Sequence, residues 1–85
     1  MNLYKYFFAV TESQNVSRAG EKLRVSQPSV SYNLHALQRE LGKQLFVIER
    51  HGIVPTPQAR ALYRRLKPVY VAFLRIVNEF MQGQK

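Results

Sequence analysis

Residues 17–46, SRAGEKLRVSQPSVSYNLHALQRELGKQLF, contain the pattern that decides the fold. Ser26 is a good N-cap residue, and Gln27 and Pro28 fall in the first helical turn, where a missing N–H leaves no hydrogen bond unmade. Gly42 stands where a left-handed residue commonly ends a helix. Four apolar residues between them form one helical stripe, at Val30, Leu34, Leu37 and Leu41. The sequence therefore predicts a helix that begins after Ser26 and ends at Gly42.

A shorter helix is predicted just before this one. We expect it to start at Ser17, a good N-cap residue, with Ala19 and Leu23 on its inner side. Gly20 in its middle costs about 1 kcal/mol relative to alanine. Two interpretations of Gly20 stay open: a weak helix, or the close approach of another helix at that point.

Residues 2–14 also have apolar residues at helical spacing, namely Leu3, Phe7 and Val10, with Tyr6 beside them. Asn2 can cap the start of this helix, and the polar stretch SQNVS, residues 13–17, is predicted to be a turn. The aromatic residues between Tyr4 and Phe8 suggest stacking on single-stranded bases. Packing in the core and onto the last helix explains them more simply.

After Gly42 the pattern changes to that of a small β-hairpin. Residues 45–48 are β-prone, His51-Gly52 is a turn signal, and residues 53–54 can pair back as a second strand that Pro55 ends. Because a two-stranded ribbon is marginally stable alone, we expect this hairpin, the wing, to lean on the helices.

The end of the chain predicts one long helix, capped by Thr56 and with Pro57 at its first position. Six apolar residues follow a heptad seam: Leu62, Leu66, Val69, Phe73, Ile76 and Phe80. The small domain before it cannot cover so long a helix, so we expect the seam to pack against the same helix of a second chain. Pro68 removes one hydrogen bond and should kink the helix near Arg64. The alternative is a helix that breaks at Lys67-Pro68 and folds back.

Composition narrows the classes of function. The chain has 85 residues, with 13 Lys and Arg against five acidic residues, and a formal net charge of +8. It has no Cys, which excludes disulfides, zinc clusters and thiol nucleophiles, and no Asp to build a metal cage. With two His and no Gly-rich phosphate loop, we expect neither an enzyme nor a cofactor. The charge favours an anionic partner, either nucleic acid or an acidic membrane surface.

The order helix, short turn, helix, wing is that of a winged helix-turn-helix, a mainly α fold. In that arrangement the second helix of the pair enters the major groove of DNA, while the first helix and the wing touch phosphates. The predicted groove-facing residues lie opposite the apolar stripe: Gln27, Pro28, Ser31, Tyr32 and His35. The predicted backbone contacts are Ser17 and Arg18 at the start of the first helix of the pair, and Arg50 and His51 at the wing tip.

The same residues resemble the signature of the LysR-type transcriptional regulators. That signature is roughly S-x-A-A-x-x-L-x-x-S-Q-P-x-x-S-x-x-I-x-x-L-E-x-x-L-G-x-x-L-F. This chain matches it at Ala19, Leu23, Ser26, Gln27, Pro28, Ser31, Leu37, Leu41, Gly42, Leu45 and Phe46. His51-Gly52 and Thr56 then stand where the family has an Arg-Gly turn and the start of a linker helix. The resemblance covers residues 1 to about 81.

The resemblance implies a winged helix-turn-helix DNA-binding domain in residues 1–56 and a dimerising linker helix in residues 57–85. It implies a bacterial, cytoplasmic transcription regulator whose dimers bind imperfect palindromes in promoter DNA, and it allows dimers to pair into tetramers in a full-length protein. Members normally continue into a larger C-terminal domain that binds a small-molecule inducer. The chain is therefore expected to be an excised DNA-binding domain or a naturally short relative.

Several positions depart from the family pattern: Gly20, Tyr32, Gln38, Ile48, His51, Pro55 and Ala59. Tyr32 matters most, because this position of the family often carries a base-reading Arg. A Tyr can contact a thymine methyl group or a phosphate, but it cannot grip guanine as Arg does. The fold implied by the resemblance survives these changes, whereas the operator preference does not transfer.

Two other classes of function stay open from the residues alone. The Arg-rich last helix suggests a basic amphipathic protein of membrane surfaces, although it lacks Trp and its apolar stripe is a heptad seam. We do not expect a membrane partner, and flotation with anionic liposomes would test this. A non-specific binder of RNA or single strands is the third class, which competition between polynucleotide and duplex promoter DNA would test.

Overall fold

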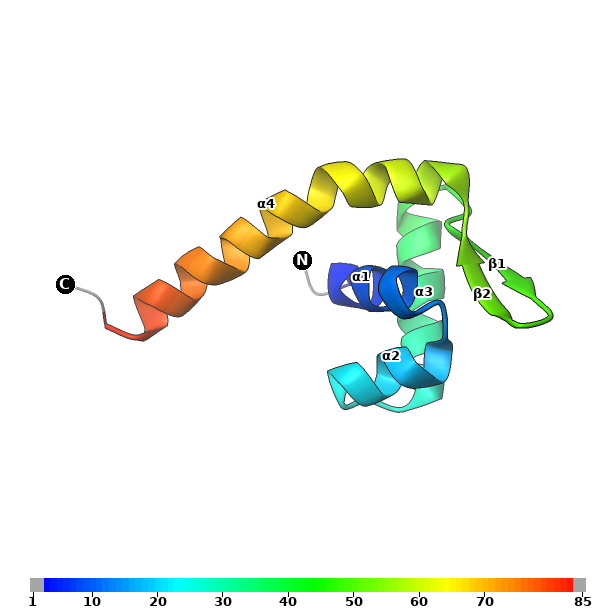
Figure 1. Ribbon diagram of the computed structural model, residues 1–85, viewed down its shortest axis with the longest axis horizontal. Coiled ribbons are helices and arrows are strands. Elements are labelled where there is room, and N and C mark those ends of the chain that lie inside the picture. The colour runs from blue at the N-terminus through cyan, green and yellow to red at the C-terminus, as the bar shows by residue number, and fades with distance from the viewer. Residues whose placement is uncertain (1–2, 84–85) are drawn as a thin grey trace.

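The computed structural model describes residues 3–83 and has the winged helix-turn-helix fold that the sequence predicts (Figure 1). Its elements are α1 Tyr4–Ser13, α2 Val16–Leu23, α3 Gln27–Leu41, β1 Phe46–Glu49, β2 Gly52–Pro55 and α4 Pro57–Met81. The first three helices pack together, the wing follows α3, and α4 runs out beyond them, which gives extents of 50 × 26 × 21 Å.

The start of α2 differs from the prediction. Asn15, not Ser17, is the N-cap: its backbone is extended, and its Oδ1 accepts a hydrogen bond of 2.9 Å from the N–H of Arg18. Asn caps as well as Ser does, so the earlier of the two residues takes the position and Ser17 falls inside the first turn. The predicted five-residue turn shrinks to Gln14 and Asn15, because α1 continues through Ser13.

The start of α1 also differs. Asn2, the predicted cap, lies outside the described residues, and the N-cap position is held by Leu3, whose side chain makes no capping hydrogen bond. The aromatic residues of α1 are used as expected. Phe7 and Phe8 are buried, and both rings contact Tyr63 of α4, at centroid distances of 6.4 and 5.9 Å. They are therefore not available to single-stranded bases.

The predicted start and end of α3 are confirmed. Ser26 accepts a hydrogen bond from the N–H of Ser29 at its start, and Gly42 adopts the left-handed conformation (φ 65°) at its end. The predicted stripe faces inward: Val30, Leu34 and Leu37 are buried, and Leu41 is half-buried.

Gly20 is explained by close approach rather than by a weak helix. A Cβ at this position would lie 2.8 Å from the carbonyl oxygen of Val25, 3.6 Å from Val30 and 3.7 Å from the N–H of Gln27. The nearest group belongs to the turn, and the next two belong to α3. Gly20 therefore allows α2 and the start of α3 to pack tightly.

The wing is a two-stranded antiparallel sheet in which Val47 pairs with Val54 and Ile48 with Ile53. The turn is Arg50-His51, not His51-Gly52, because Gly52 pairs with Glu49 as the first residue of β2. Leu45 precedes β1, and β2 ends at Pro55 as predicted, with Pro55 as its last paired residue. As expected, the wing leans on the helices: Gln38 of α3 accepts hydrogen bonds from the N–H groups of residues 45 and 46.

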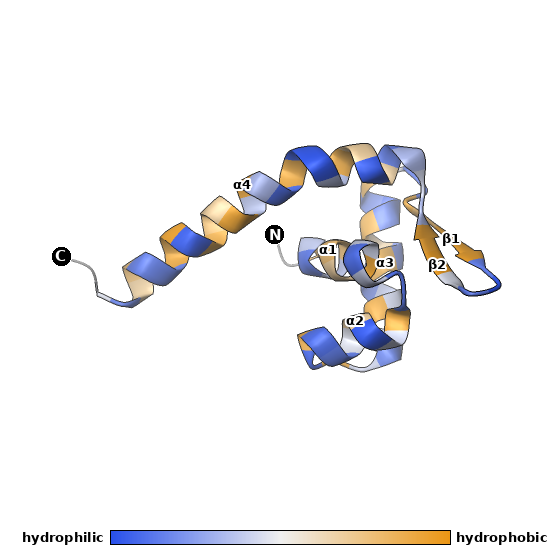
Figure 2. Ribbon diagram, in the orientation of Figure 1, coloured by the Kyte–Doolittle hydropathy of each residue, from blue (hydrophilic) through white to orange (hydrophobic). Residues whose placement is uncertain are grey.

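The helix α4 runs without a break from Pro57 to Met81, capped by Thr56, so it does not fold back at Pro68. Figure 1 shows it changing direction in its yellow part, in the region before Pro68 where the kink is predicted. Its first half packs on the domain, with Leu62 and Leu66 against the core. Its second half extends away and alternates apolar and polar residues along its surface (Figure 2).

Candidate nucleic-acid interface

The outward face of α3 carries the residues predicted to face a groove. Gln27, Pro28, Tyr32 and His35 are exposed, and Ser31 is half-buried. Tyr32 has 68% of its surface accessible. Because the opposite face is fixed in the core by Val30, Leu34 and Leu37, the helix can turn no other side outward.

A concave surface lies between the starts of α2 and α3 and the wing. It encloses about 300 Å³ and is lined by Asn15, Val16, Ser17, Gln27, Ile48, Glu49, Arg50, Gly52 and Ile53. It brings together three of the predicted site residues, Ser17, Gln27 and Arg50, which come from three different elements. The helix N-terminus and the positive charge of Arg50 suit a phosphate group.

A smaller hollow of about 110 Å³ continues this surface along α3. Its lining includes Ser31 and His35, two predicted groove residues, together with the apolar side chains of Ile48 and Phe46. Ile48, which lines both hollows, is 77% exposed and is not among the predicted site residues. In the sequence, this position is marked by its departure from the family pattern, where an Arg is usual.

One hydrogen bond joins the two helices of the motif at this surface. The hydroxyl of Ser17 donates to Oε1 of Gln27 at 3.0 Å. Both side chains are exposed, and no local pattern in the sequence predicts their contact, because ten residues separate them.

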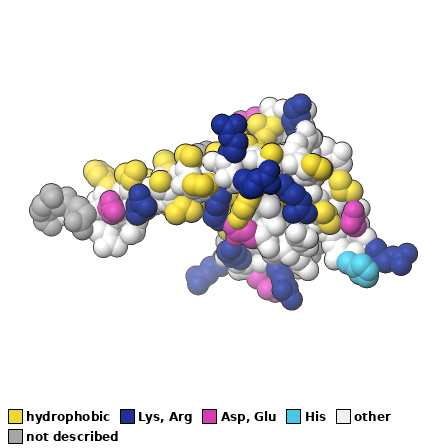
Figure 3. Space-filling model, turned by 45° about the horizontal axis from the view of Figure 1, so that its top comes forward, with side chains coloured by type: hydrophobic (Ala, Val, Ile, Leu, Met, Phe, Trp, Pro, Cys, Tyr) yellow, Lys and Arg dark blue, Asp and Glu magenta, His cyan; other side chains and the backbone are white. Residues whose placement is uncertain are grey.

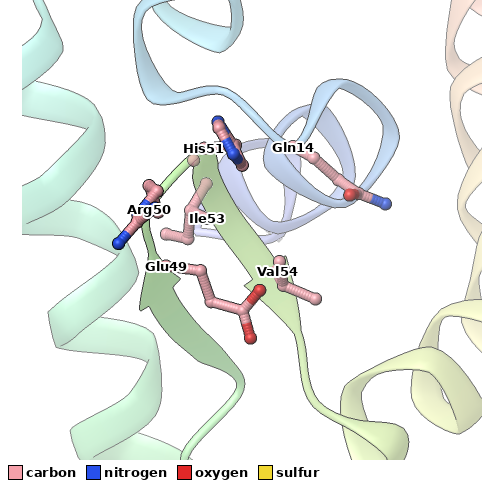
Figure 4. A pocket seen from close by; sticks show the side chains of 7 residues that line it. Gln14, Glu49, Arg50, His51, Ile53 and Val54 are labelled. Carbon is pink, nitrogen blue, oxygen red and sulfur yellow. The ribbon is translucent and has the colours of Figure 1, made fainter.

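The wing tip projects Arg50 and His51 as a two-residue turn, and both are exposed. Figure 4 shows the two side chains leaving the turn in different directions. A hollow of about 190 Å³ beside the tip is lined by Gln14 and residues 49–54. The tip rests on the end of α1, since a Cβ on Gly52 would lie 2.7 Å from the carbonyl oxygen of Gln14.

Basic side chains are spread over the face seen in Figure 3: several lie over the first half of α4, others lie along the lower edge, and one lies beside a His at the end of the molecule away from the tip of α4. The basic residues in the first half of α4 are Arg60, Arg64, Arg65 and Lys67. Apolar side chains cover the outer half of α4 in the same view.

Glu12 of α1 is the centre of a small network that joins three helices. It accepts from Lys22 of α2 at 3.0 Å and from the hydroxyl of Tyr63 at 2.6 Å, and it pairs with Lys67 of α4. Partial burial by itself raises the pKa of Glu12, but the hydrogen bonds from Lys67, Tyr63 and Lys22 outweigh it and lower that pKa from 4.5 to about 2. The hydrogen bond to Glu12, with burial, raises the pKa of Tyr63 to about 12.

The described part of the chain offers neither a metal site nor a membrane span. Within residues 3–83, no three His, Cys, Asp or Glu residues lie close enough to hold a metal ion. No helix in this range is both long and apolar enough to cross a bilayer.

Residues 1–60 match the sequence profile of the bacterial regulatory helix-turn-helix proteins of the lysR family. The chain belongs to the LysR family. Related proteins of this family include the small neutral protease regulatory protein of Streptomyces coelicolor, 34% identical over 71 residues, which are 84% of this chain and 22% of that protein. CysL, an HTH-type transcriptional regulator of Bacillus subtilis, is 38% identical over 66 residues, 78% of this chain and 22% of that protein. The chain thus spans about a fifth of the length of these LysR-family relatives.

Solved LysR-family structures have the same architecture. The DNA-binding domain of CbnR in complex with DNA matches with a TM-score of 0.83 at 27% identity, over 99% of this chain and 97% of that one. The DNA-binding domain of BenM in complex with catB site 1 DNA matches with a TM-score of 0.85 at 27% identity, over 95% and 91%. Both relatives were solved on DNA, so the chain is a LysR-type DNA-binding domain.

Proposed function

We propose that the chain binds a specific sequence of double-stranded DNA as a homodimer, with α3 in the major groove and the wing on the backbone or in the minor groove. The single observation that supports this most is the outward face of α3. This face exposes polar and aromatic side chains beside the wing. Relatives with the same fold were solved in complex with DNA. The target is a promoter with an imperfect palindrome, because two identical subunits related by a two-fold axis read two half-sites.

The site residues fall into two groups, those that would contact base edges and those that would contact the phosphate backbone. Gln27, Pro28, Ser31, Tyr32 and His35 lie on the reading face of α3. We assign contacts with the phosphate backbone to Arg18 at the start of α2 and to Arg50 and His51 at the wing tip, because their side chains are exposed. Ser17 lines the same concave surface as Arg50.

The dimer forms through the outer half of α4. Four residues of the heptad seam, Val69, Phe73, Ile76 and Phe80, are exposed there, and Phe80 is 82% accessible. Leu74, Val77 and Met81 on the neighbouring stripe are exposed as well, so the apolar face is broad. Exposed apolar patches of this kind mark interfaces, whereas Leu62 and Leu66 are already used by the core. On this basis we infer a DNA-binding unit, residues 1–56, followed by a linker and dimerisation segment, residues 57–85, that contains α4.

Selection of bound duplexes from a random library tests the proposal. We expect a two-fold motif with two half-sites about one helical turn apart. Enrichment of no sequence, or of a single unpaired half-site, would contradict it. Competition with polynucleotide RNA and flotation with anionic vesicles serve as controls, because preference for either over duplex DNA would favour the other two classes of partner.

A further inference from the structure

The hydrogen bond between Ser17 and Gln27 gives Ser17 a role that capping does not use. Asn15 caps α2, so the Ser17 hydroxyl in the first turn is free to act elsewhere. It donates to Oε1 of Gln27, the first residue of α3, at 3.0 Å. The contact crosses from one helix of the motif to the other.

This contact orients the Gln27 amide. An amide has a carbonyl end that only accepts and an NH₂ end that only donates, and without a partner it can rotate to present either end. Ser17 supplies a donor, which favours the carbonyl on its side and leaves the NH₂ end directed elsewhere. Among residues 3–83, no group accepts a hydrogen bond from this NH₂, and the Gln27 side chain is exposed.

We propose that Ser17 is a positioning residue that holds Gln27 with its NH₂ group presented to the base edges, so that Gln27 selects a base with an acceptor. The proposal rests on the proposed function, in which α3 lies in the major groove. There, guanine offers N7 and O6, adenine offers N7 and thymine offers O4, while cytosine offers only the N4 donor. A bidentate contact to adenine requires Oε1 to accept from N6 as well as from Ser17.

The alternative role for Ser17 is a direct contact with a phosphate. The two roles differ in what they predict for different DNA sequences. A phosphate contact is lost equally on every duplex, whereas an orienting contact matters only where Gln27 meets the right base. The effect of replacing Ser17 depends on the presence of Gln27 if Ser17 orients Gln27, and is independent of Gln27 if Ser17 contacts a phosphate.

Binding of five proteins tests this: wild type, Ser17→Ala, Ser17→Thr, Gln27→Ala and the Ser17→Ala/Gln27→Ala double variant. Each is titrated with the selected duplex, with the three other base pairs at the Gln27 position, and with random duplex. We expect Ser17→Ala to reduce the preference for the favoured pair about fivefold, the typical worth of one hydrogen bond. The loss on random duplex should be much smaller. Ser17→Thr, which keeps the hydroxyl, should retain the preference, and Ser17→Ala should add nothing to Gln27→Ala.

Three results would overturn the proposal. One is unchanged base preference in Ser17→Ala, and another is an equal loss on selected and random duplex that persists in the Gln27→Ala background. The third is a favoured contact that survives removal of the base acceptors (7-deazapurines for N7, 2-aminopurine for guanine O6, 5-methyl-2-pyrimidinone for thymine O4), while removal of the cytosine N4 amine abolishes it. If wild type itself prefers no duplex sequence, the proposed function fails and this proposal fails with it. Circular dichroism checks that every variant is folded.

Discussion

Tyr32 places an aromatic ring on the outward face of α3, at a position where the LysR pattern often has Arg. Tyr can contact a thymine methyl group or a phosphate, but it lacks the paired donors that grip guanine. We therefore expect Tyr32→Arg to shift the preferred base toward guanine at one position of each half-site, by about 1–3 kcal/mol. Selection of bound duplexes with wild type and variant side by side measures this shift.

Arg50 at the wing tip is expected to contact the DNA backbone, in contrast to Tyr32, which is expected to contact bases. Its exposed guanidinium is placed for the backbone, so Arg50→Ala should weaken binding to selected and random duplex by similar factors and should reduce the salt slope by about one unit. If Tyr32→Arg leaves the selected motif unchanged while Arg50→Ala alters it, the wing reads the sequence and α3 does not.

At the scale of elements, Glu12 ties α1 to α2 and α4. Its pKa is lowered from 4.5 to about 2, so the network stabilises the fold above pH 4.5 and is lost as the pH falls toward 2. We expect Glu12→Gln to lower the free energy of unfolding by about 1–2 kcal/mol at pH 7, after allowance for solvent screening.

The difference between Glu12→Gln and wild type should shrink between pH 4.5 and 2, because the wild-type carboxylate becomes neutral there. Urea unfolding at several pH values measures it. Glu21→Gln is the matched control, since Glu21 is exposed and makes no ion pair within the described residues. A constant difference down to pH 2 would show that the Glu12 charge does not stabilise the fold.

The wing depends on Gly52 for two reasons. Its φ of 145° is disfavoured for residues that have a side chain. In addition, an added Cβ would lie 2.7 Å from the carbonyl oxygen of Gln14. Gly52→Ala should therefore cost about 1–3 kcal/mol of stability and displace the wing. Gly42→Ala is the control, because Gly42 also has positive φ but open space around it. Thermal unfolding that shows equal losses for both variants would contradict the steric part of the argument.

At the scale of the whole molecule, the outer half of α4 lies beyond the domain, and its apolar side chains are exposed. We expect Phe73→Asp/Ile76→Asp to give monomers, because two charges would face the partner helix. Leu66 is avoided, since it packs on the core and a charge there would also destabilise the domain. Arg75→Asp should stay dimeric, because helical spacing puts Arg75 opposite both apolar stripes of the same helix. Sedimentation that finds the double variant still dimeric would reject this interface.

The net charge of +8 per chain acts over the whole molecule. If about six phosphates are neutralised by the dimer, affinity for duplex DNA should fall about a thousandfold between 50 and 200 mM salt. Titration of a labelled duplex at four salt concentrations measures the slope. A flat response would contradict the electrostatic account of binding.

The sequence by itself determined the order of the elements and most of their limits. Ser26, Gly42 and Thr56 act through hydrogen bonds and backbone angles within their own turns, and the apolar stripe of α3 follows from a fixed helical period. The prediction failed where two local signals competed, as with Asn15 and Ser17 for the cap of α2. It also failed by one residue in the wing turn, because only the pairing of Gly52 with Glu49 decides the register.

Only the tertiary structure decided which side chains from different elements meet. Ser17 and Gln27 are ten residues apart and Glu12 and Tyr63 are 51 apart, so their contacts depend on how the helices cross and rotate against each other. The heptad seam of α4 shows the same division: the periodicity lies in the sequence, but only packing shows that Leu62 and Leu66 serve the core while Phe73 and Ile76 stay exposed. Local hydrogen bonds and periodicity are encoded residue by residue, whereas burial depends on neighbours brought near by the folded chain.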